Sequence, residues 1–172
     1  MGRLLSEKWK TAFFDTDAVL EEMKGKSCRE IFNEEGEQAF KDSETAACKK
    51  IFSENEGNIV VATGGGICNN PDALKILEEH GKFVFLEVEE EVACLRITKK
   101  IAFDEEGNIT DFSGVPAFIR KHNPKNMDDV KKSFHEFYVA RTEIYRKLCK
   151  TSVRLDNSSK EDNCRKIMVL LN

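Results

Sequence analysis

Short apolar runs alternate with longer segments of helical periodicity along most of this chain. The runs have the length and composition of β-strands, and the segments between them carry apolar residues on one face of a helix. Predicted strands cover residues 11–15, 58–62, 82–88 and, more weakly, 152–155, and predicted helices cover residues 36–54, 71–81, 128–149 and 159–171. Strands that alternate with helices of this length indicate βαβ units and a mostly parallel sheet. The fold class is therefore α/β.

The helical periodicity fails between residues 99 and 127. This polar, charged stretch is interrupted by turn-forming residues, namely Gly107, Ser113, Gly114, Pro116 and Pro124. A structureless segment of this length in a compact domain is usually functional or mobile. Two interpretations are open: a lid over a binding site, or a surface insertion that the fold tolerates.

Length, charge and cysteine content narrow the class of protein. A chain of 172 residues fits one domain with a real core. Its net charge is −4 with both signs interspersed, so no basic face is present for nucleic acid or anionic lipid, and a small-molecule partner is expected. The six cysteines are scattered, without a C-x-x-C motif, which disfavours a disulfide framework and a zinc site. No apolar run is long enough to span a membrane, and we expect a cytoplasmic protein with reduced thiols.

The first predicted strand ends in two carboxylates, in the run Phe13-Phe14-Asp15-Thr16-Asp17. Residues i and i+2 of an extended segment point the same way, so Asp15 and Asp17 are expected to direct their oxygens into one pocket. In open α/β sheets, ligands bind at this end of the strands. Carboxylates so close repel one another unless a cation or a hydroxyl-bearing ligand shares the site. The alternative is that Asp17 only caps the helix predicted to follow it.

The second predicted strand runs into three consecutive glycines, in Val60-Val61-Ala62-Thr63-Gly64-Gly65-Gly66. A glycine turn can adopt backbone conformations closed to other residues, and it lets a ligand touch the backbone. Its N–H groups can then act as hydrogen-bond donors. The alternative is a flexible exit from the strand.

Together, residues 13–44 and 60–66 closely resemble shikimate kinases, which carry D-T-D, I-E, G-x-S-I-x-E-I-F, G-E-x-x-F-R-x-x-E and A-T-G-G-G in the same order and with similar spacing. The segment Ala140-Arg141-Thr142-Glu143-Ile144-Tyr145-Arg146 resembles the R-x-x-L-Y helix of that family. The resemblance covers nearly the whole chain. It implies a single three-layer α/β/α domain of the P-loop kinase type over residues 1–172, with a lid at about 99–127.

The resemblance also implies the activity. Members of this family use ATP and Mg²⁺ to phosphorylate the 3-hydroxyl of shikimate, on the route to chorismate and the aromatic amino acids. The implied partner is the small molecule shikimate, without nucleic acid or membrane, and the implied state is a cytoplasmic monomer. Two alternatives stay open: a catalytically inactive shikimate-binding module, and another small-molecule kinase such as a gluconate kinase.

Individual roles follow from the resemblance, position by position. Asp15 would hold Mg²⁺ through water, and Asp17 would accept a hydrogen bond from the attacking shikimate hydroxyl and help to remove its proton. Arg141 would pair with the substrate carboxylate through two parallel hydrogen bonds. The remaining positions would contact the ring hydroxyls through the backbone or support the substrate site: Gly64, Gly65, Gly66, Lys41, and Glu44, which would orient Lys41.

Three features depart from the family pattern. Lys41 stands where the family has arginine, which keeps the charge but loses the fork geometry. The lid has no R-P-L-L motif, and Lys100 and Arg120 are only guesses for its arginine. No G-x-x-x-x-G-K-S/T occurs, and residues 1–8 resemble the helix that follows that phosphate loop. We therefore expect that the first, central strand and the P-loop are missing and that ATP binding is impaired. The resemblance also implies an adenine contact near Asn157-Ser158.

Overall fold

The computed structural model describes residues 1–171. Its strands are β1 (Ala12–Asp15), β2 (Ile59–Ala62), β3 (Val84–Val88), β4 (Ala102–Phe103), β5 (Ile109–Asp111) and β6 (Thr151–Leu155). Its helices are α1 (Gly2–Trp9), α2 (Thr16–Lys24), α3 (Cys28–Ser53), the 3₁₀ turn η1 (Ile67–Asn69), α4 (Pro71–His80), α5 (Glu90–Thr98), α6 (Ala117–Arg120), α7 (Met127–Leu148) and α8 (Lys160–Leu171). All four predicted strands and all four predicted helices are present, with shifts at their ends.

The chain divides into two compact units. The first unit consists of residues 1–83 together with the C-terminal residues from 159 onward, and the second consists of residues 84–158. In the first unit β1 and β2 pair in parallel, from Ala12 opposite Ile59 to Asp15 opposite Ala62. Both strands therefore end at the same edge of the pair.

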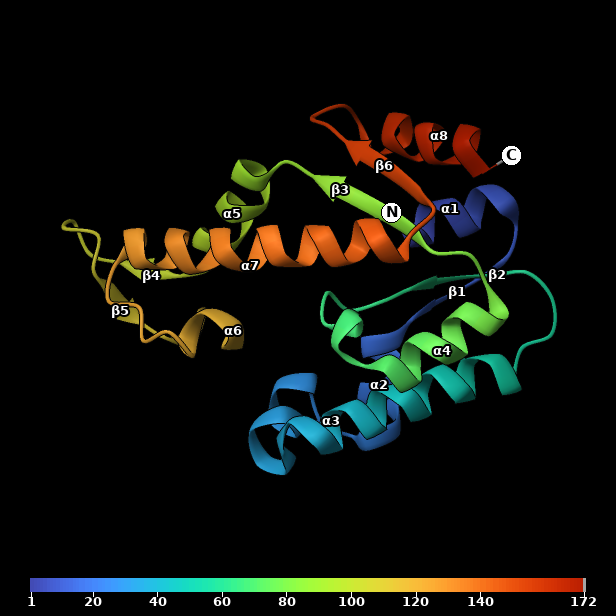
Figure 1. Cartoon of the computed structure of the whole chain (residues 1–172), viewed down its shortest axis with the longest axis horizontal. Helices are drawn as coiled ribbons and strands as arrows, with labels where there is room; N and C mark the ends of the chain where they lie inside the picture. The colour runs from blue at the N-terminus through green and yellow to red at the C-terminus, as the bar shows by residue number, and fades with distance from the viewer. Residues whose placement is uncertain (172) are drawn as a thin grey trace. The chain divides into compact units, whose positions relative to one another are not determined.

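Helices of the first unit pack around this strand pair. Helix α2 packs against α3, and α3 packs against α4, as Figure 1 shows, while α1 contacts β1, β2 and α8. Three side chains with no exposed surface form the apolar centre between α2 and α3, namely Leu20, Ile31 and Ala47. Burial of the Leu20 and Ile31 side chains stabilises this unit by about 1.5–3 kcal/mol each.

Helix α3 begins earlier than the predicted helix at residue 36. Ser27 and Glu30 form a capping box, in which each side chain binds the backbone N–H of the other. Gly36 has a φ of 88°, outside the helical region, so two helical segments meet there in a kink. The sequence pattern showed only the second segment, because the periodicity is interrupted at the kink.

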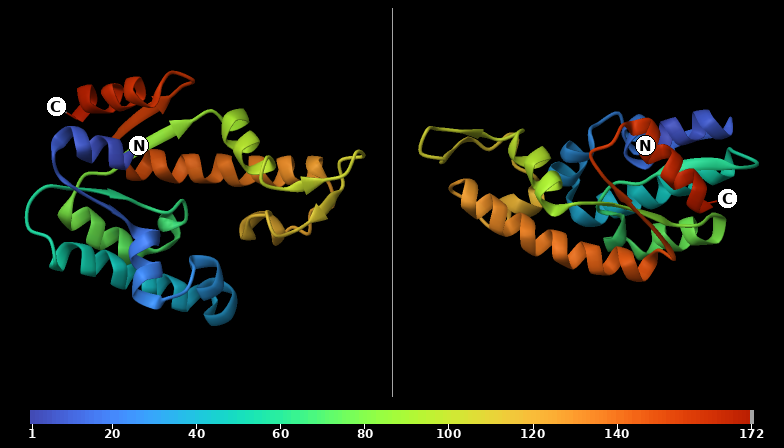
Figure 2. Two further views of the ribbon diagram at one scale, coloured as in Figure 1. Left: turned by 180° about the vertical axis from the view of Figure 1, so that it is seen from behind. Right: turned by 90° about the horizontal axis from the view of Figure 1, so that it is seen from above.

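In the second unit β3 and β6 pair in parallel, from Val84 opposite Thr151 to Val88 opposite Leu155. Helices α5 and α7 contact one another and lie side by side in all the views of Figures 1 and 2. The hydroxyl of Tyr138, on α7, donates to the carbonyl of Val88 at 2.8 Å, which ties the helix to the end of β3.

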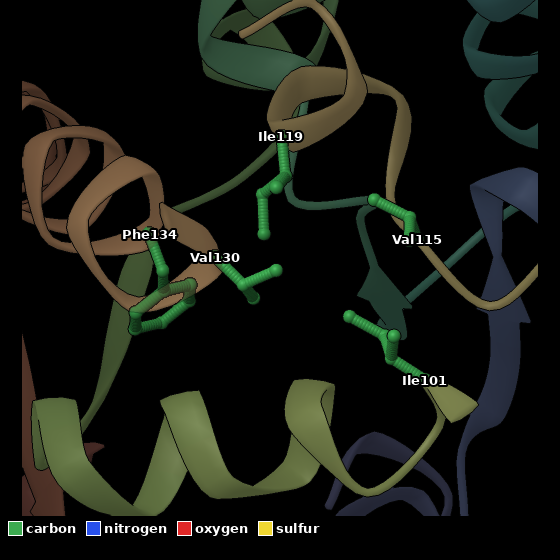
Figure 3. Packing of buried hydrophobic residues seen from close by; sticks show 5 residues of the cluster. All are labelled: Ile101, Val115, Ile119, Val130 and Phe134. Atoms are coloured by element: carbon green, nitrogen blue, oxygen red, sulfur yellow. The ribbon is translucent and has the colours of Figure 1, made fainter. Parts of the chain in front are cut away.

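The prediction of a structureless segment over residues 99–127 is wrong. Strands β4 and β5 form an antiparallel hairpin, and the short helix α6 follows it. The five side chains that converge in Figure 3 form a buried cluster that joins this segment to α7: Ile101, Val115, Ile119, Val130 and Phe134. Val130 and Phe134 lie one turn apart on the predicted helix, whereas Ile101, Val115 and Ile119 come from the segment before it, so pattern alone did not reveal that the two pack together.

One glycine fixes the path of this segment. A Cβ atom on Gly114 would collide with the backbone carbonyl of Lys100 and would lie 3.2 Å from the Cα of Ile101. The chain at Gly114 therefore approaches the start of the segment more closely than any residue with a side chain allows.

The predicted mostly parallel sheet is not continuous within the described residues. Strands pair as β1–β2 and β3–β6 in parallel and as β4–β5 in antiparallel orientation, in three two-stranded sheets. The α/β class and the parallel strands are confirmed. Within residues 1–171, no helix has the length and apolar character needed to cross a membrane.

Candidate functional site

The junction of β1 and α2 places the two predicted carboxylates differently from the expectation. Helix α2 begins at Thr16, so Asp15 is its N-cap, and Asp15 Oδ1 accepts hydrogen bonds from the backbone N–H groups of Asp17 at 3.1 Å and Ala18 at 3.4 Å. The alternative that Asp17 is the cap is therefore wrong. Asp15 and Asp17 also do not share one extended segment, because Asp17 lies in the first turn of the helix.

Asp17 instead reaches the glycine turn that follows β2. A Cβ atom built on Gly64 would lie 2.6 Å from Asp17 Oδ1 and 2.9 Å from Oδ2. The backbone N–H of Gly64 donates to the hydroxyl of the buried Thr16 at 3.3 Å. The two motifs thus meet at the carboxyl ends of β1 and β2, where the sequence placed a ligand site.

This close approach favours glycine at position 64, because a Cβ there would displace the Asp17 carboxylate. Gly66 has a φ of −98°, and neither Gly64 nor Gly66 lies in the left-handed region that favours glycine. The turn continues into η1, with the N–H of Ile67 bound to the carbonyl of Gly64 at 3.2 Å. Space for the Asp17 carboxylate, and not unusual backbone geometry, explains the residue type at Gly64.

The electrostatic setting of Asp17 favours a proton. Burial raises the pKa of its carboxyl above 3.8, and the nearby carboxylates of Asp15 and Glu21 raise the pKa further. The carboxylate makes no hydrogen bond or ion pair with any of residues 1–171. A half-buried carboxylate of this kind is a ready acceptor for the hydroxyl of a ligand.

Cys28 borders the same carboxylate, and the sequence did not single it out. Its Sγ lies 3.8 Å from the carbonyl oxygen of Asp17, and its backbone N–H donates to Glu21 Oε1 at 2.9 Å. Burial, together with Asp17 and Glu21, raises the pKa of this thiol to about 12. The thiol is therefore neutral at physiological pH and is not a nucleophile.

A second residue missed by the sequence analysis, Asn70, ties the glycine turn to α3. Its side chain donates to Glu44 Oε2 at 2.9 Å and to the carbonyl of Lys41 at 2.8 Å, and it caps α4 by accepting from Ala73 N–H at 3.2 Å. Both Asn70 and Glu44 are 2% exposed. The signal in the sequence was an asparagine directly before Pro71, a common start of a helix.

Arg141 belongs to the second unit. It lies on α7, where its Cζ is 4.0 Å from the centre of the Phe137 ring. The half-buried guanidinium makes no ion pair with another residue in the described part of the chain.

A family model for shikimate kinase matches residues 1–172. The chain belongs to the shikimate kinase family. Of its relatives, a shikimate kinase from Pelotomaculum thermopropionicum is 35% identical over 100 residues, which cover 58% of this chain and 57% of that protein. The chain thus spans little more than half the length of the first curated relatives that it matches. A shikimate kinase from Francisella philomiragia is 28% identical over 99% of this chain and 86% of its own length.

Solved structures of the shikimate kinase family share the fold. A shikimate kinase from Acinetobacter baumannii, determined in complex with shikimate, superposes on 99% of this chain and 83% of its own, with a TM-score of 0.76 at 23% identity. The α/β fold with parallel strands is therefore that of the family.

Lys41, where the resemblance leads to the expectation of an arginine, pairs with Glu37 Oε1 at 2.9 Å, one turn earlier on α3. The orientation of Lys41 by Glu44 stays a prediction, and the Glu44 carboxylate accepts a hydrogen bond from the Asn70 side chain at 2.9 Å. A lysine that is paired with a residue of its own helix keeps its positive charge. It cannot form the bidentate hydrogen bonds that an arginine would form.

Among the guesses for the arginine of a shikimate kinase lid, Arg120 has a structural role. Its Nη2 donates to the carbonyls of Phe112 at 2.6 Å and Val115 at 3.3 Å, which closes the loop before α6. Lys100 is exposed in the turn after α5. Asn157 and Ser158 lie in the turn after β6, where the Ser158 N–H binds Asp156 Oδ1 at 3.0 Å.

No group of three or more histidine, cysteine or acidic side chains in the described residues could hold a metal ion. A Mg²⁺ site needs fewer protein ligands than that, since Mg²⁺ keeps several waters and uses one or two carboxylates together with substrate phosphates. Asp15, at the N-cap of α2, is a carboxylate of the kind that such a site would use.

Proposed function

We propose that this chain acts as a shikimate kinase, with transfer of the terminal phosphoryl group of ATP to the 3-hydroxyl of shikimate. The observation that carries the proposal is the unpartnered Asp17 carboxylate against Gly64, in a chain that the family model matches from residue 1 to 172. A hydroxyl seated on Asp17 would face the carboxyl ends of β1 and β2, where open α/β sheets bind their ligands.

Asp17 accepts the hydrogen bond of the attacking hydroxyl and takes its proton as the new O–P bond forms. Burial and the neighbouring carboxylates raise its pKa, which makes it a stronger base than an ordinary aspartate. The backbone of Gly64, Gly65 and Gly66 contacts the ring hydroxyls. These contacts orient the hydroxyl for in-line attack, which is where most catalysis of phosphoryl transfer arises.

Arg141 binds the carboxylate of shikimate through the fork of its guanidinium. Its lack of an ion-pair partner in residues 1–171 supports this role, because an arginine that is already paired would have to exchange partners. Lys41 and Glu44 are further residues of the proposed shikimate site. The relative from Acinetobacter baumannii, solved with shikimate, supports the choice of ligand.

Asp15 would hold Mg²⁺ through water. One of its oxygens caps α2, and the other accepts no hydrogen bond in the described residues, which leaves it free for a bound water. When bound, the ion neutralises charge on the phosphates of ATP.

The proposal for ATP binding concerns residues 1–172 by themselves. They contain no G-x-x-x-x-G-K-S/T motif, and β2 and β3 each pair with a single strand within the described residues. We propose that these residues lack the first strand and phosphate loop of the family, so that they bind shikimate but hold ATP weakly and transfer phosphate slowly.

Calorimetry with shikimate, gluconate and Mg·ATP tests the substrate side. We expect residues 1–172 to bind shikimate, and to bind it more weakly after Asp17→Asn, while Glu22→Gln on the exposed face of the same helix leaves affinity unchanged. Preference for gluconate over shikimate would overturn the assignment of the substrate.

A chimera tests the reaction itself. The strand and phosphate loop of a family member, placed ahead of Met1, should restore ATP-dependent phosphorylation of shikimate. A chimera that binds both ligands without turnover would identify the chain as an inactive binding module. Ordinary turnover by residues 1–172 alone would refute the proposed impairment.

A further inference from the structure

Two aromatic rings and the Arg141 guanidinium form one column in the second unit. Phe118, on α6, stacks on Phe137, on α7, with ring centres 3.6 Å apart and planes 11° from parallel. Arg141 follows Phe137 by one helical turn, and its Cζ lies 4.0 Å from the centre of the same ring. At these distances the two neighbours cannot share one face of the Phe137 ring, so each covers its own face.

The position of Phe118 is set by the folded segment over residues 99–127. Its neighbour Ile119 has no exposed surface and packs in the cluster with Val130 and Phe134 (Figure 3). Arg120, next along, holds the carbonyls of Phe112 and Val115. Val115 before Phe118 and Ile119 after it both pack in the cluster with residues of α7, and Arg120 closes the loop between them, which keeps the Phe118 ring against Phe137.

The column leaves the guanidinium able to bind an anion. A guanidinium is planar, and an aromatic ring attracts it electrostatically while making no use of its N–H donors. Arg141 forms no ion pair with any residue that the structure describes, so no acid in residues 1–171 competes for the charge. Stacking on Phe137 restricts the rotamers of a long side chain before a ligand arrives, which lowers the entropy lost on binding.

We propose that Phe118 and Phe137 are positioning residues for Arg141, and that through them the segment over residues 99–127 contributes to recognition of the substrate carboxylate. The inference rests on the proposed role of Arg141 in binding shikimate. It assigns to α6 a function that the lid interpretation did not contain. In this role, α6 holds Phe118 against Phe137, and Phe137 in turn keeps Arg141 in place to bind the carboxylate.

The test compares the affinity of the full chain for shikimate and for shikimate methyl ester, whose carboxylate charge is removed. Phe118→Leu and Phe137→Leu should each weaken shikimate binding about two- to tenfold, the range of a cation–π contact. The affinity for the methyl ester should not change, and Phe137→Tyr should retain normal shikimate affinity. Phe52→Leu is the matched control, because it removes a stacked pair with His80 in the first unit, where the ring centres are 4.3 Å apart.

Arg141→Met separates this inference from the proposed function. If Arg141→Met leaves shikimate affinity unchanged, the proposed role of Arg141 is wrong. If it weakens shikimate binding while the phenylalanine variants do not, only the positioning role is wrong. Equal loss for shikimate and its methyl ester in either phenylalanine variant also overturns the positioning role, because it reports general damage. In the Arg141→Met background, Phe137→Leu should cause no further loss.

Discussion

The turn around Asp17 and Gly64 and the segment over residues 99–127 differ in what holds them in place. At the turn, polar groups meet at the ends of two paired strands, and the one carboxylate without a partner has a raised pKa. In the segment, buried aliphatic side chains pack around α6 without any long regular element. The first region keeps a half-buried carboxylate near like charges, which costs stability, whereas the second is stabilised by buried apolar packing.

This difference follows from how the two regions use their residues. Asp17 faces like charges from Asp15 and Glu21, which a structure selected for stability alone would avoid. Ile119 and Val115 are fully buried, and such residues contribute free energy of folding without a chemical role. Substitutions in the two regions should therefore change stability and binding in different proportions.

The largest effect is expected from Ile119→Ala. Removing a fully buried isoleucine side chain from the cluster with Val115 and Val130 should lower the free energy of unfolding by about 2–5 kcal/mol. Chemical denaturation measures this change. Ile144→Ala on α7, where the side chain is 40% exposed, is the control and should change stability by less than about 0.5 kcal/mol. Similar losses for both variants would show that the segment has no core of its own.

Gly114→Ala should destabilise the same segment through its backbone. The new Cβ would collide with the carbonyl of Lys100, and a backbone group cannot move aside as a side chain can. We expect a loss of about 1–3 kcal/mol. Amide hydrogen exchange should show the lost protection within residues 99–127. Unchanged exchange there would contradict the close approach of Gly114 to Lys100.

Gly64→Ala should affect binding more than stability. The added methyl group would occupy the space 2.6 Å from Asp17 Oδ1, and the carboxylate must shift to make room. A loss of about 1 kcal/mol in stability is expected, at the low end for overpacking, because a side chain gives way. Shikimate affinity should fall sharply in calorimetry.

Gly81→Ala is the matched control for Gly64→Ala. A Cβ there meets only the carbonyl of Leu77 at 3.7 Å, and the φ of −162° is extended. This variant should gain about 0.4–1 kcal/mol, since alanine restricts the unfolded chain. If both glycine variants bind shikimate normally, Gly64 has no part in the site.

The sequence predicted the first region well because its signals are local. A strand that ends in D-T-D and another that ends in three glycines specify their positions relative to the strand ends, and parallel pairing brings those ends together. The cap at Asp15 was missed for a physical reason. Whether a helix begins one residue earlier or later depends on which side chain captures its free N–H groups, and Asp15, Thr16 and Asp17 can all do so.

The second region was missed because its order depends on residues far apart in the sequence. Ile101 and Phe134 pack in one cluster, yet neither stands in a periodic pattern that includes the other. Asn70 was missed similarly, since its links to Lys41 and Glu44 cross from one helix to another. Single-sequence patterns report local elements, and the contacts between elements are left to the fold.

The smallest effect expected of a site residue is that of Asp17→Asn on stability, and it is a gain. The pKa of Asp17 is raised in the folded state, so as pH rises above 3.8 the unfolded chain ionises first and unfolding becomes easier. The stability that this carboxyl contributes is complete below pH 3.8 and is lost as pH rises through the folded pKa. Asparagine stays neutral, so the variant should be more stable than the parent at pH 7, and the difference should vanish in acid.

Denaturation at pH 7 and at pH 3.5 measures this difference, with Asp15→Ala as the comparison. Asp15 caps α2, and its loss should cost about 0.5–2 kcal/mol at pH 7. Two aspartates of one short turn would then change stability in opposite directions: one supports the helix, and the other is kept for a ligand. A loss of stability in Asp17→Asn at pH 7 would show instead that Asp17 also supports the fold, and the contrast between the two regions would fail at the residue on which the proposed chemistry depends.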